Sequence, residues 1–264
     1  KIKETIKKED IINLIAHFLI QYLLKFFLFN YLCIVTALSY AFSQPLKSFR
    51  PFDWVLYKAS GSVTSFTEGY TFIYVGTSLG GIKRFNAYGN YFDDPISTAQ
   101  GLEDNIINAV HFDKKTGFLW ASTPHHIQYS FSREGDWFSK SFRDIGLSKF
   151  DKVTQIGSSD SYIWLKALSS YVKLDNSSGM MVGIYPVPDE INILWSSGEY
   201  NKYYESNDDF TNFIVLDGWM LNGDELIDPI GNRKKITTVL FTQYGNVFLG
   251  SEDGVVFYGS KTME

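Results

Sequence analysis

Two acidic pairs are the residues best suited to acid–base chemistry. Glu103-Asp104 and Glu252-Asp253 each place two carboxylates next to one another in a polar stretch beside a β-rich run. If the two stretches faced each other, one carboxyl group could donate a proton while another accepted one, as general acid–base catalysis requires. Carboxylates are also common in solvated turns, because they bind water and nearby backbone N–H groups. We therefore expect these residues to lie in loops, and we expect no enzyme activity.

The histidines and the remaining motifs indicate neither a metal nor a cofactor. His125 and His126 are adjacent, and adjacent residues in a turn point in different directions, so they rarely bind one metal ion. The nearest further histidine, His111, falls in a predicted strand. The polar run that begins at Asp113 lacks the alternating ligands and the late Glu of a calcium loop. The sequence also contains no phosphate loop, nucleophile elbow or dinucleotide fingerprint.

These candidate residues lie between short runs that predict β-strands. From Gly101 to Phe131 the chain reads as a β-rich run, an Asp-to-Gly turn, a second run, a polar turn and an alternating third run. The unit recurs when it is aligned on an aromatic residue of its second strand, at Tyr74, Trp120, Trp164 and Phe248, at steps of about 45 residues or twice that. Such a period is typical of propeller blades. We expect the four aromatic side chains to pack between neighbouring blades.

The clearest unit also carries a family resemblance. It contains Gly101-Leu102, then Ile107-Asn108-Ala109-Val110, Phe112-Asp113, and Gly117 followed by Leu119-Trp120 and Thr123. This pattern resembles the two-component regulator propeller repeat, which is found in periplasmic sensor parts of bacterial hybrid histidine kinases and in other secreted bacterial propellers. The resemblance covers the chain from about Val63 onward. It implies an all-β fold, a β-propeller of four-stranded antiparallel blades, and a role in extracytoplasmic recognition or sensing.

The repeat predicts about five blades. They fall near residues 63–95, 101–142, 147–188, 191–232 and 236–264, and the fourth of them is degenerate. Asp53–Ala59 reads as a good strand with no partner in its own unit, so we expect it to complete the last blade and close the ring without a free edge. The alternative is a larger ring, of roughly six to eight blades, of which this chain holds only a part.

Residues 1–43 differ in kind from the rest of the chain. Lysines precede a hydrophobic stretch from Ile11 to Ala41, which only Lys25 interrupts before the chain turns polar. Phe26–Ala41 reads as the apolar core of a secretory signal, with small residues before a cut at Gln44. The alternative is an uncleaved membrane anchor in which Lys25 snorkels to the surface. Both readings predict a hydrophobic helix and export of residues 44–264 to the periplasm or the cell surface.

The net charge and the distribution of basic residues argue against one class of binding partner. The 264 residues carry a net charge of −5 and show no basic cluster, whereas nucleic-acid binding needs a Lys/Arg face. We therefore expect no nucleic-acid partner, and contact with a membrane only through the N-terminal segment.

A rim of loops is the predicted binding site. In a propeller blade, the loop before the first strand and the turn between the second and third strands open on the same face. We expect an unidentified small ligand, glycan or protein to bind there without chemical change. The alternatives are a propeller glycosidase or lyase acting on polysaccharide, and a secretion or cell-surface scaffold. The rim residues are Ser78, Leu79, Gln100, Glu103, Asp104, His125, His126, Ser169, Glu252 and Asp253.

Overall fold

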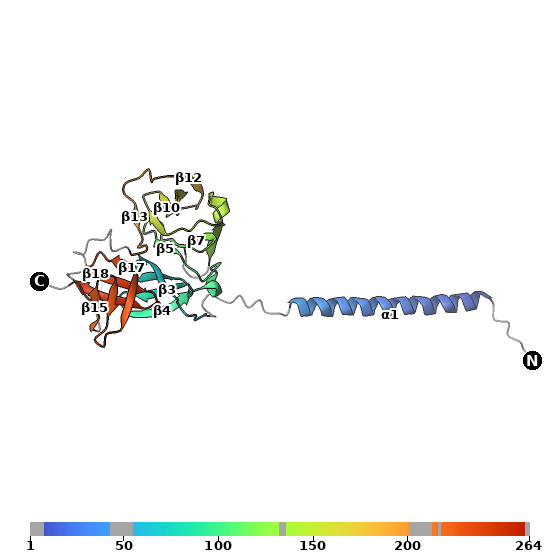
Figure 1. Ribbon diagram of the computed structural model, residues 1–264. Helices are drawn as coiled ribbons and strands as arrows, with labels where there is room; N and C mark the ends of the chain where they lie inside the picture. Colours follow the sequence, from blue (N-terminus) through green and yellow to red (C-terminus); the bar gives the residue numbers. More distant parts are fainter. Residues whose placement is uncertain (1–7, 43–54, 132–135, 201–212, 216–217, 262–264) are drawn as a thin grey trace, which may run out of the picture. The chain divides into compact units, whose positions relative to one another are not determined.

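The computed structural model describes residues 8–42, 55–131, 136–200, 213–215 and 218–261. It divides the chain into two compact units, Lys1–Ser48 and Phe49–Glu264. Figure 1 shows the helix α1 of the first unit and the strands of the second, which we call the β unit. The protein is therefore an all-β chain preceded by an apolar helix, as the sequence predicts.

Helix α1 (Lys8–Phe42) is 35 residues long. The side chains from Ile15 to Ile34 are exposed, and all are apolar except His17, Gln21, Lys25 and Asn30. An exposed helix with so many apolar side chains is typical of a membrane environment. These 20 residues are long and apolar enough to cross a membrane, although a signal sequence near the N-terminus has the same properties. The structure thus agrees with both predicted roles of this segment.

The first two sheets each contain four antiparallel strands in chain order. The strands of the first sheet are β1 (Val63–Glu68), β2 (Phe72–Thr77), β3 (Ile82–Asn86) and β4 (Tyr91–Ile96). Those of the second are β5 (Ala109–Phe112), β6 (Leu119–Ser122), β7 (His126–Ser130) and β8 (Trp137–Ser141). A short 3₁₀ helix follows each sheet: η1 (Thr98–Gln100) and η2 (Phe142–Ile145).

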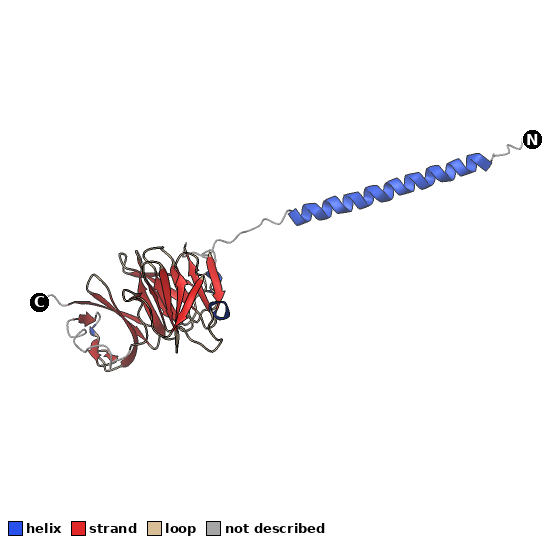
Figure 2. Cartoon of the chain, turned by 90° about the horizontal axis from the view of Figure 1, so that it is seen from above, coloured by secondary structure: helices blue, strands red, loops and turns tan. Residues whose placement is uncertain are grey.

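The third and fourth sheets have additional strands. The third contains β9 (Gln155–Ser158), β10 (Tyr162–Lys166), β11 (Tyr171–Asp175) and β12 (Met181–Tyr185), with β13 (Leu194–Trp195) on the other side of β9. The fourth has the order β14 (Phe213–Val215), β19 (Val256–Lys261), β18 (Asn246–Ser251), β17 (Arg233–Phe241), β16 (Glu225–Ile227) and β15 (Met220–Asn222). Figure 2 shows that strands dominate the β unit.

The prediction that Asp53–Ala59 completes the last sheet is wrong. Within it, Val55–Ala59 forms no strand, and residues 53 and 54 lie outside the described residues. The outer edge of β19 is paired instead with β14, where Phe213 faces Lys261 and Val215 faces Gly259. The stretch before β1 is held at the first sheet, because the carbonyl groups of Ser60 and Ser62 accept hydrogen bonds from the β2–β3 turn. It is therefore kept away from the edge that it was expected to fill.

Residues 191–232, expected to form a degenerate blade, build no sheet of their own among the described residues. Strand β13 joins the edge of β9, β14 joins β19, and the hairpin β15–β16 joins β17. The segment lacks the alternating apolar pattern that would let it bury two faces of a separate sheet. Its short strands are stabilised by sheets that already exist.

Each sheet contacts the neighbouring sheets through one strand. We call β1, β5, β9 and β17 the inner strands: β17 contacts β1, β1 contacts β5, and β5 contacts β9. The order of the sheets is therefore fourth, first, second and third, so that the last sheet lies beside the first, as the red and cyan ribbons of Figure 1 show.

Side-chain hydroxyl groups join the inner strands. Thr64 Oγ1 donates to the Ile107 carbonyl group over 2.7 Å. Ser65 Oγ and Thr67 Oγ1 each accept from an N–H group of β5, those of Val110 and Phe112, over 2.9 Å. On the other side of β1, Thr237 Oγ1 donates to the Val63 carbonyl group over 2.7 Å. These hydroxyl groups satisfy backbone groups that have no strand partner, which would otherwise be costly to bury.

Leu194–Tyr200, which we call the central segment, crosses between three inner strands. Ser196 donates its N–H and its hydroxyl to the Ile156 carbonyl group of β9. Ser197 N–H donates to the Phe66 carbonyl group over 3.1 Å, while Ser197 Oγ accepts from Phe66 N–H over 2.6 Å. Tyr200 N–H donates to the Thr237 carbonyl group over 2.9 Å. Residues between the third and fourth sheets in sequence thus hold both to the first.

The approach of the central segment to β9 requires glycine at position 157. A Cβ atom there would lie 2.7 Å from Ile193 Cγ2 and 2.9 Å from the Trp195 ring, closer than side-chain atoms pack.

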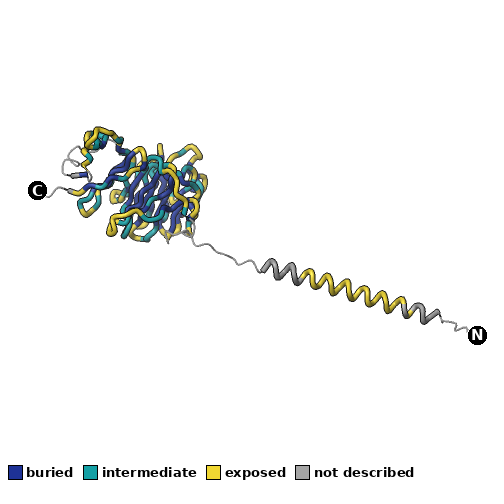
Figure 3. The backbone as a smooth tube through the Cα atoms, turned by 90° about the horizontal axis from the view of Figure 1, so that it is seen from below, coloured by how far each residue is buried: buried dark blue, intermediate teal, exposed yellow. Residues whose placement is uncertain are grey.

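The four repeated aromatic residues are buried, as predicted. Tyr74 packs in a cluster with residues of the second sheet, and Trp120 in a cluster with residues of the third. Phe248 of the fourth sheet packs against the first. Each therefore fills the space between its own sheet and the next, and Figure 3 shows the resulting buried interior of the β unit. Trp164 differs, because its indole N–H donates to Glu190 Oε2 over 2.9 Å instead of meeting another sheet.

The fourth sheet covers its second face with its own strands. Val215 of β14 and Leu226 of β16 are buried in one cluster with Val247 and Leu249 of β18, and Trp219 and Leu221 pack against it. The two edge strands, β14 and β15, contact each other, so the sheet curls over this cluster. It therefore offers one face, not two, to a neighbouring sheet.

We expect Ser197→Ala to destabilise the β unit by about 1–3 kcal/mol, because it leaves Phe66 N–H buried without a partner. Urea unfolding of the full chain in a non-ionic detergent measures this loss. Ser169→Ala is the matched control, since Ser169 is exposed. Equal unfolding free energies for the two variants would contradict a stabilising role for the central segment.

Candidate functional site

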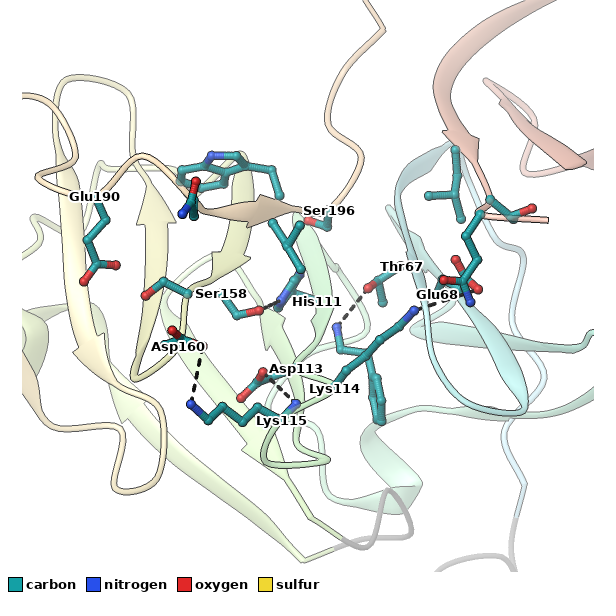
Figure 4. Close-up of a pocket in the computed structure, with 18 of the residues that line it drawn as sticks. Thr67, Glu68, His111, Asp113, Lys114, Lys115, Ser158, Asp160, Glu190 and Ser196 are labelled. Carbon is teal, nitrogen blue, oxygen red and sulfur yellow. Dashed lines mark hydrogen bonds and ion pairs between the residues drawn. The ribbon is translucent and has the colours of Figure 1, made fainter. Parts of the chain in front are cut away.

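A cavity of about 1190 Å³ opens where the inner strands end. Thr67 and Glu68 at the end of β1, His111 on β5, Ser158 on β9 and Leu240 on β17 all line it. The inner strands run in the same direction, so their last residues meet at one end of the β unit. Figure 4 shows the side chains that converge there. We call this space the central cavity.

His111 is a deeply buried ionisable group of the central cavity. Its side chain is 4% exposed, and its Nε2 lies 2.8 Å from Ser158 Oγ. Its Nδ1 has no hydrogen-bond partner among the described residues. Burial lowers the pKa of His111 from its usual value near 6.5 to about 4, although the Asp113 carboxylate opposes this shift. The imidazole is therefore neutral at pH 7.

Two lysines of the β5–β6 turn reach to opposite sides of the cavity. Lys114 Nζ lies 3.9 Å from Glu68 of the first sheet, and Lys115 Nζ lies 3.5 Å from Asp160 of the third. The two side chains diverge in Figure 4. Solvated ion pairs of this kind contribute about 0–1 kcal/mol each to folding stability. These two pairs therefore fix where the lysine charges lie more than they stabilise the fold.

A charged cluster beside β11 forms another wall. Lys173 Nζ lies 2.8 Å from Asp189 Oδ1 and 3.1 Å from Glu190 Oε1. The same ammonium group lies 4.2, 4.9 and 5.9 Å from the ring centres of Tyr162, Trp164 and Tyr185. Cation–π attraction and two carboxylates therefore hold one buried lysine.

The charged forms of Glu190 and Lys173 are both stabilised. Burial alone would raise the pKa of Glu190, but hydrogen bonds from Ser159, Trp164 and Lys173 outweigh it and the pKa lies below its usual value. Burial alone would lower the pKa of Lys173, but hydrogen bonds to Asp189 and Glu190 raise it. The carboxylate is thus held as an anion, which makes it a poor proton donor at neutral pH.

Apolar side chains complete the lining. Ile191 is 99% exposed and Leu194 72% exposed, and both line the central cavity with Trp195 and Phe241. Large apolar side chains in a concave, solvent-accessible place are typical of a binding surface.

The predicted rim lies at the other end of the sheets. Gly81 N–H donates to the Asn105 carbonyl group and Ile107 N–H to the Thr77 carbonyl group, so the β2–β3 turn and the loop before β5 do share one face, as expected. Phe142 N–H likewise donates to the carbonyl group of His125, in the β6–β7 turn. The central cavity, by contrast, is lined by the ends of the inner strands, and none of the predicted rim residues lines it.

The rim residues have different surroundings. Gln100 is 1% exposed and caps η1 through Ser97. Ser78 Oγ accepts from Ser62 N–H, and Asp104 Oδ1 accepts from Ile106 N–H. His126 is half-buried on β7. Leu79, Glu103, His125, Ser169 and Glu252 are exposed.

The structure does not join the acidic pairs. No hydrogen bond or ion pair among the described residues links Glu103 or Asp104 to Glu252 or Asp253. Asp253 instead pairs with Lys234 and accepts from Ser251 Oγ. Burial alone would raise the pKa of Asp253, but these hydrogen bonds lower it. Within the described part of the chain, no group of three or more His, Cys, Asp or Glu side chains is arranged to hold a metal ion.

Sequence reasoning did not single out Lys173, Glu190 or Ser158. One signal was present: Lys173 stands between the apolar residues Val172 and Leu174 in the middle of a strand. A charged residue in such a position needs a partner. Its partners Asp189 and Glu190 follow the next strand, β12, and no local sequence pattern identifies them as partners.

No protein-family model matches the chain. No curated protein matches it either.

Several solved structures are similar at low identity. The extracellular domain of the putative one component system BT4673 from B. thetaiotaomicron is 13% identical, with a TM-score of 0.36 over 77% of this chain and 21% of that one. The extracellular domain of the putative hybrid two component system BT3049 from B. thetaiotaomicron is 16% identical, with a TM-score of 0.39 over 78% and 35%. Saccharomyces cerevisiae Sqt1 is 11% identical, with a TM-score of 0.34 over 73% and 42%. The chain thus spans less than half the length of each.

The buried neutral state of His111 predicts a pH-dependent stability. Between pH 6.5 and 4 the unfolded chain binds a proton at this histidine that the folded chain does not. The unfolding free energy should therefore fall as the pH drops through this window, by up to about 1.4 kcal/mol per pH unit.

Urea unfolding at pH 7 and pH 5 measures this dependence. His111→Gln should reduce the difference between the two pH values, while His125→Gln should leave it unchanged because His125 is exposed. The same pH difference in the His111→Gln variant as in the native chain would contradict the assignment.

Proposed function

We propose that the β unit is an exported, propeller-like binding module that holds a ligand in the central cavity without transforming it. The observation that carries this proposal is the convergence of the four inner strands and the central segment on one concave space. Such convergent places on a rigid scaffold are where ligands bind most often.

The packing of the sheets supports the propeller-like interpretation. The second-strand aromatic residue of the first, second and fourth sheets packs towards the next sheet in the order. Blades arranged around a central axis need such packing between each sheet and the next. The likeness of the repeat to two-component regulator propellers adds the expectation that ligand binding serves sensing or recognition.

The state of the charged groups supports binding without chemistry. Hydrogen bonds from Ser159, Trp164 and Lys173 hold Glu190 as an anion, and His111 is neutral with one ring nitrogen directed to Ser158. A carboxyl group and an imidazole whose pKa values are both lowered are poorly placed to exchange protons with a substrate at neutral pH.

The lining also bears on the class of ligand. Among the described residues, five acidic side chains line the central cavity, at positions 68, 113, 160, 189 and 190, against two lysines. This balance opposes nucleic acid, whose phosphates need positive charge. A small molecule, a glycan or a protein segment with polar groups and an apolar face fits the mixture of charged groups with Trp195 and Leu194.

Export rests on α1. An apolar helix of this length before the β unit fits a signal sequence or a membrane anchor, either of which places the β unit outside the cytoplasm. We therefore propose a periplasmic or cell-surface location.

Binding is tested with the full chain labelled with 5-fluorotryptophan. The six tryptophans give six ¹⁹F NMR signals, of which that of Trp195 is assigned by Trp195→Phe. A panel of neutral oligosaccharides, dicarboxylates, amino acids and short peptides is added one compound at a time. We expect at least one compound to shift the Trp195 signal, to leave that of Trp219 in place, and to be recovered unchanged by mass spectrometry.

A compound that is converted, with conversion lost in Glu190→Gln, would replace the binding proposal with an enzymatic one. If no compound in the panel moved the Trp195 signal, the central cavity would not be the binding site for these classes.

Export is tested by fusing alkaline phosphatase, which is active only outside the cytoplasm, after residue 264. Leu24→Arg together with Leu28→Arg should lower phosphatase activity at least tenfold, because two charges in the apolar stretch cost about 5 kcal/mol on insertion. Leu24→Val together with Leu28→Val is the matched control and should retain activity. Undiminished activity in the arginine variant would contradict export through α1.

A further inference from the structure

A second cavity, of about 500 Å³, lies between the first and fourth sheets. We call it the lateral cavity. Phe85 of β3 and Phe248 of β18 are its most buried aromatic residues, and their ring centres are 5.4 Å apart. Tyr70, Tyr88 and Tyr244 also line it and are 58%, 81% and 76% exposed. An aromatic floor is thus surrounded by exposed aromatic side chains, which are rarely left together on a surface without a partner.

The groups that line this cavity favour positive charge. Seven of the 15 described residues that line it are aromatic, and none of the 15 is Lys, Arg or His. The one charged residue among them is Glu68, whose side chain is 18% exposed. Aromatic faces carry partial negative charge, so rings and a carboxylate together attract a cation.

Two described cations near this site, Arg84 and Lys114, already have partners. Arg84, whose guanidinium carbon lies 5.3 Å from the Phe72 ring centre, pairs with Asp93 and donates to the Asp94 carbonyl group. Lys114 pairs with Glu68 at 3.9 Å, from the side of the central cavity. The long distance and the 45% exposure of the lysine side chain leave this pair weak.

We propose that the lateral cavity binds a small organic cation with a methylated or primary ammonium group. The ammonium group lies against the tyrosine and phenylalanine rings and is drawn to the Glu68 carboxylate, for which it competes with Lys114. This site is separate from the central cavity, although the two share Glu68 and Thr242 as a common wall.

The chain contains the same recognition chemistry in an occupied form. The ammonium group of Lys173 lies among three aromatic rings and two carboxylates. The lateral cavity repeats this combination of rings and carboxylate, but no lysine is among the described residues that line it. The similarity in composition is what favours a cation over a neutral aromatic ligand.

Choline and its uncharged isostere 3,3-dimethylbutan-1-ol have nearly the same shape but differ in charge. Comparing their affinities therefore shows whether the cavity selects for charge. Binding of each to the full chain, in a maltoside detergent that carries no ammonium group, is measured by ligand-observed NMR titration. We expect choline to bind about tenfold or more tightly than the isostere. Glycerophosphocholine is titrated in parallel, and tighter binding than choline would assign the site to a lipid head group and weaker binding to a free compound.

Four variants locate the site. Tyr244→Ala removes an exposed ring and should weaken choline binding about three- to tenfold. Glu68→Gln should weaken it similarly, whereas Lys114→Met, which removes the competing cation, should strengthen it. Phe150→Ala is the matched control, because Phe150 is 81% exposed and does not line the cavity.

Equal affinities for choline and the isostere would overturn the proposal, since the cavity would then select only shape. Failure of choline to bind, or an equal loss in Phe150→Ala and Tyr244→Ala, would overturn it as well. The ¹⁹F signal of Trp195 reports on the central cavity independently, so either site can fail without the other.

Discussion

The fold depends on satisfying the inner edges of sheets that do not pair with each other. Backbone groups of β1, β5, β9 and β17 face the middle of the β unit, where a missing partner would cost about 1–3 kcal/mol each. Threonine and serine hydroxyl groups satisfy them between neighbouring sheets, and the central segment satisfies those of β9, β1 and β17. Because these bonds join different sheets, they also fix the order in which the sheets stand.

This constraint produces the central cavity. Inner strands that are held side by side and run in one direction must end together, and the groups beyond their ends then converge. The central segment enters this place with Leu194 and Trp195 and closes the space between the third and first sheets. The Lys173 cluster holds the preceding residues, Asp189 and Glu190, against the third sheet. Fold and cavity thus depend on the same few contacts.

Local patterns predicted much of this fold from the sequence. The strands around Trp120 and the burial of the repeated aromatic residues follow from alternation and repeat period, which depend on neighbouring residues. The closing strand was wrong because it depends on which edge a short strand reaches, a property of distant contacts. For the same reason the sequence did not show that the described strands of residues 191–232 join other sheets. The cavity was missed for the same reason: Glu190 meets Lys173 and His111 meets Ser158 only after the sheets have assembled. The predicted rim stays a prediction.

Native-state hydrogen exchange of individual amides tests the central claim most directly. The N–H groups of Phe66, Val110 and Phe112 donate to hydroxyl groups of Ser197, Ser65 and Thr67, which lie outside their own sheets. If these bonds hold the sheets together, the three amides should exchange as slowly as the paired amides of β2, with protection close to that of global unfolding. Exchange as fast as that of the exposed turn at Tyr88 would show that the inner strands are not joined in this way.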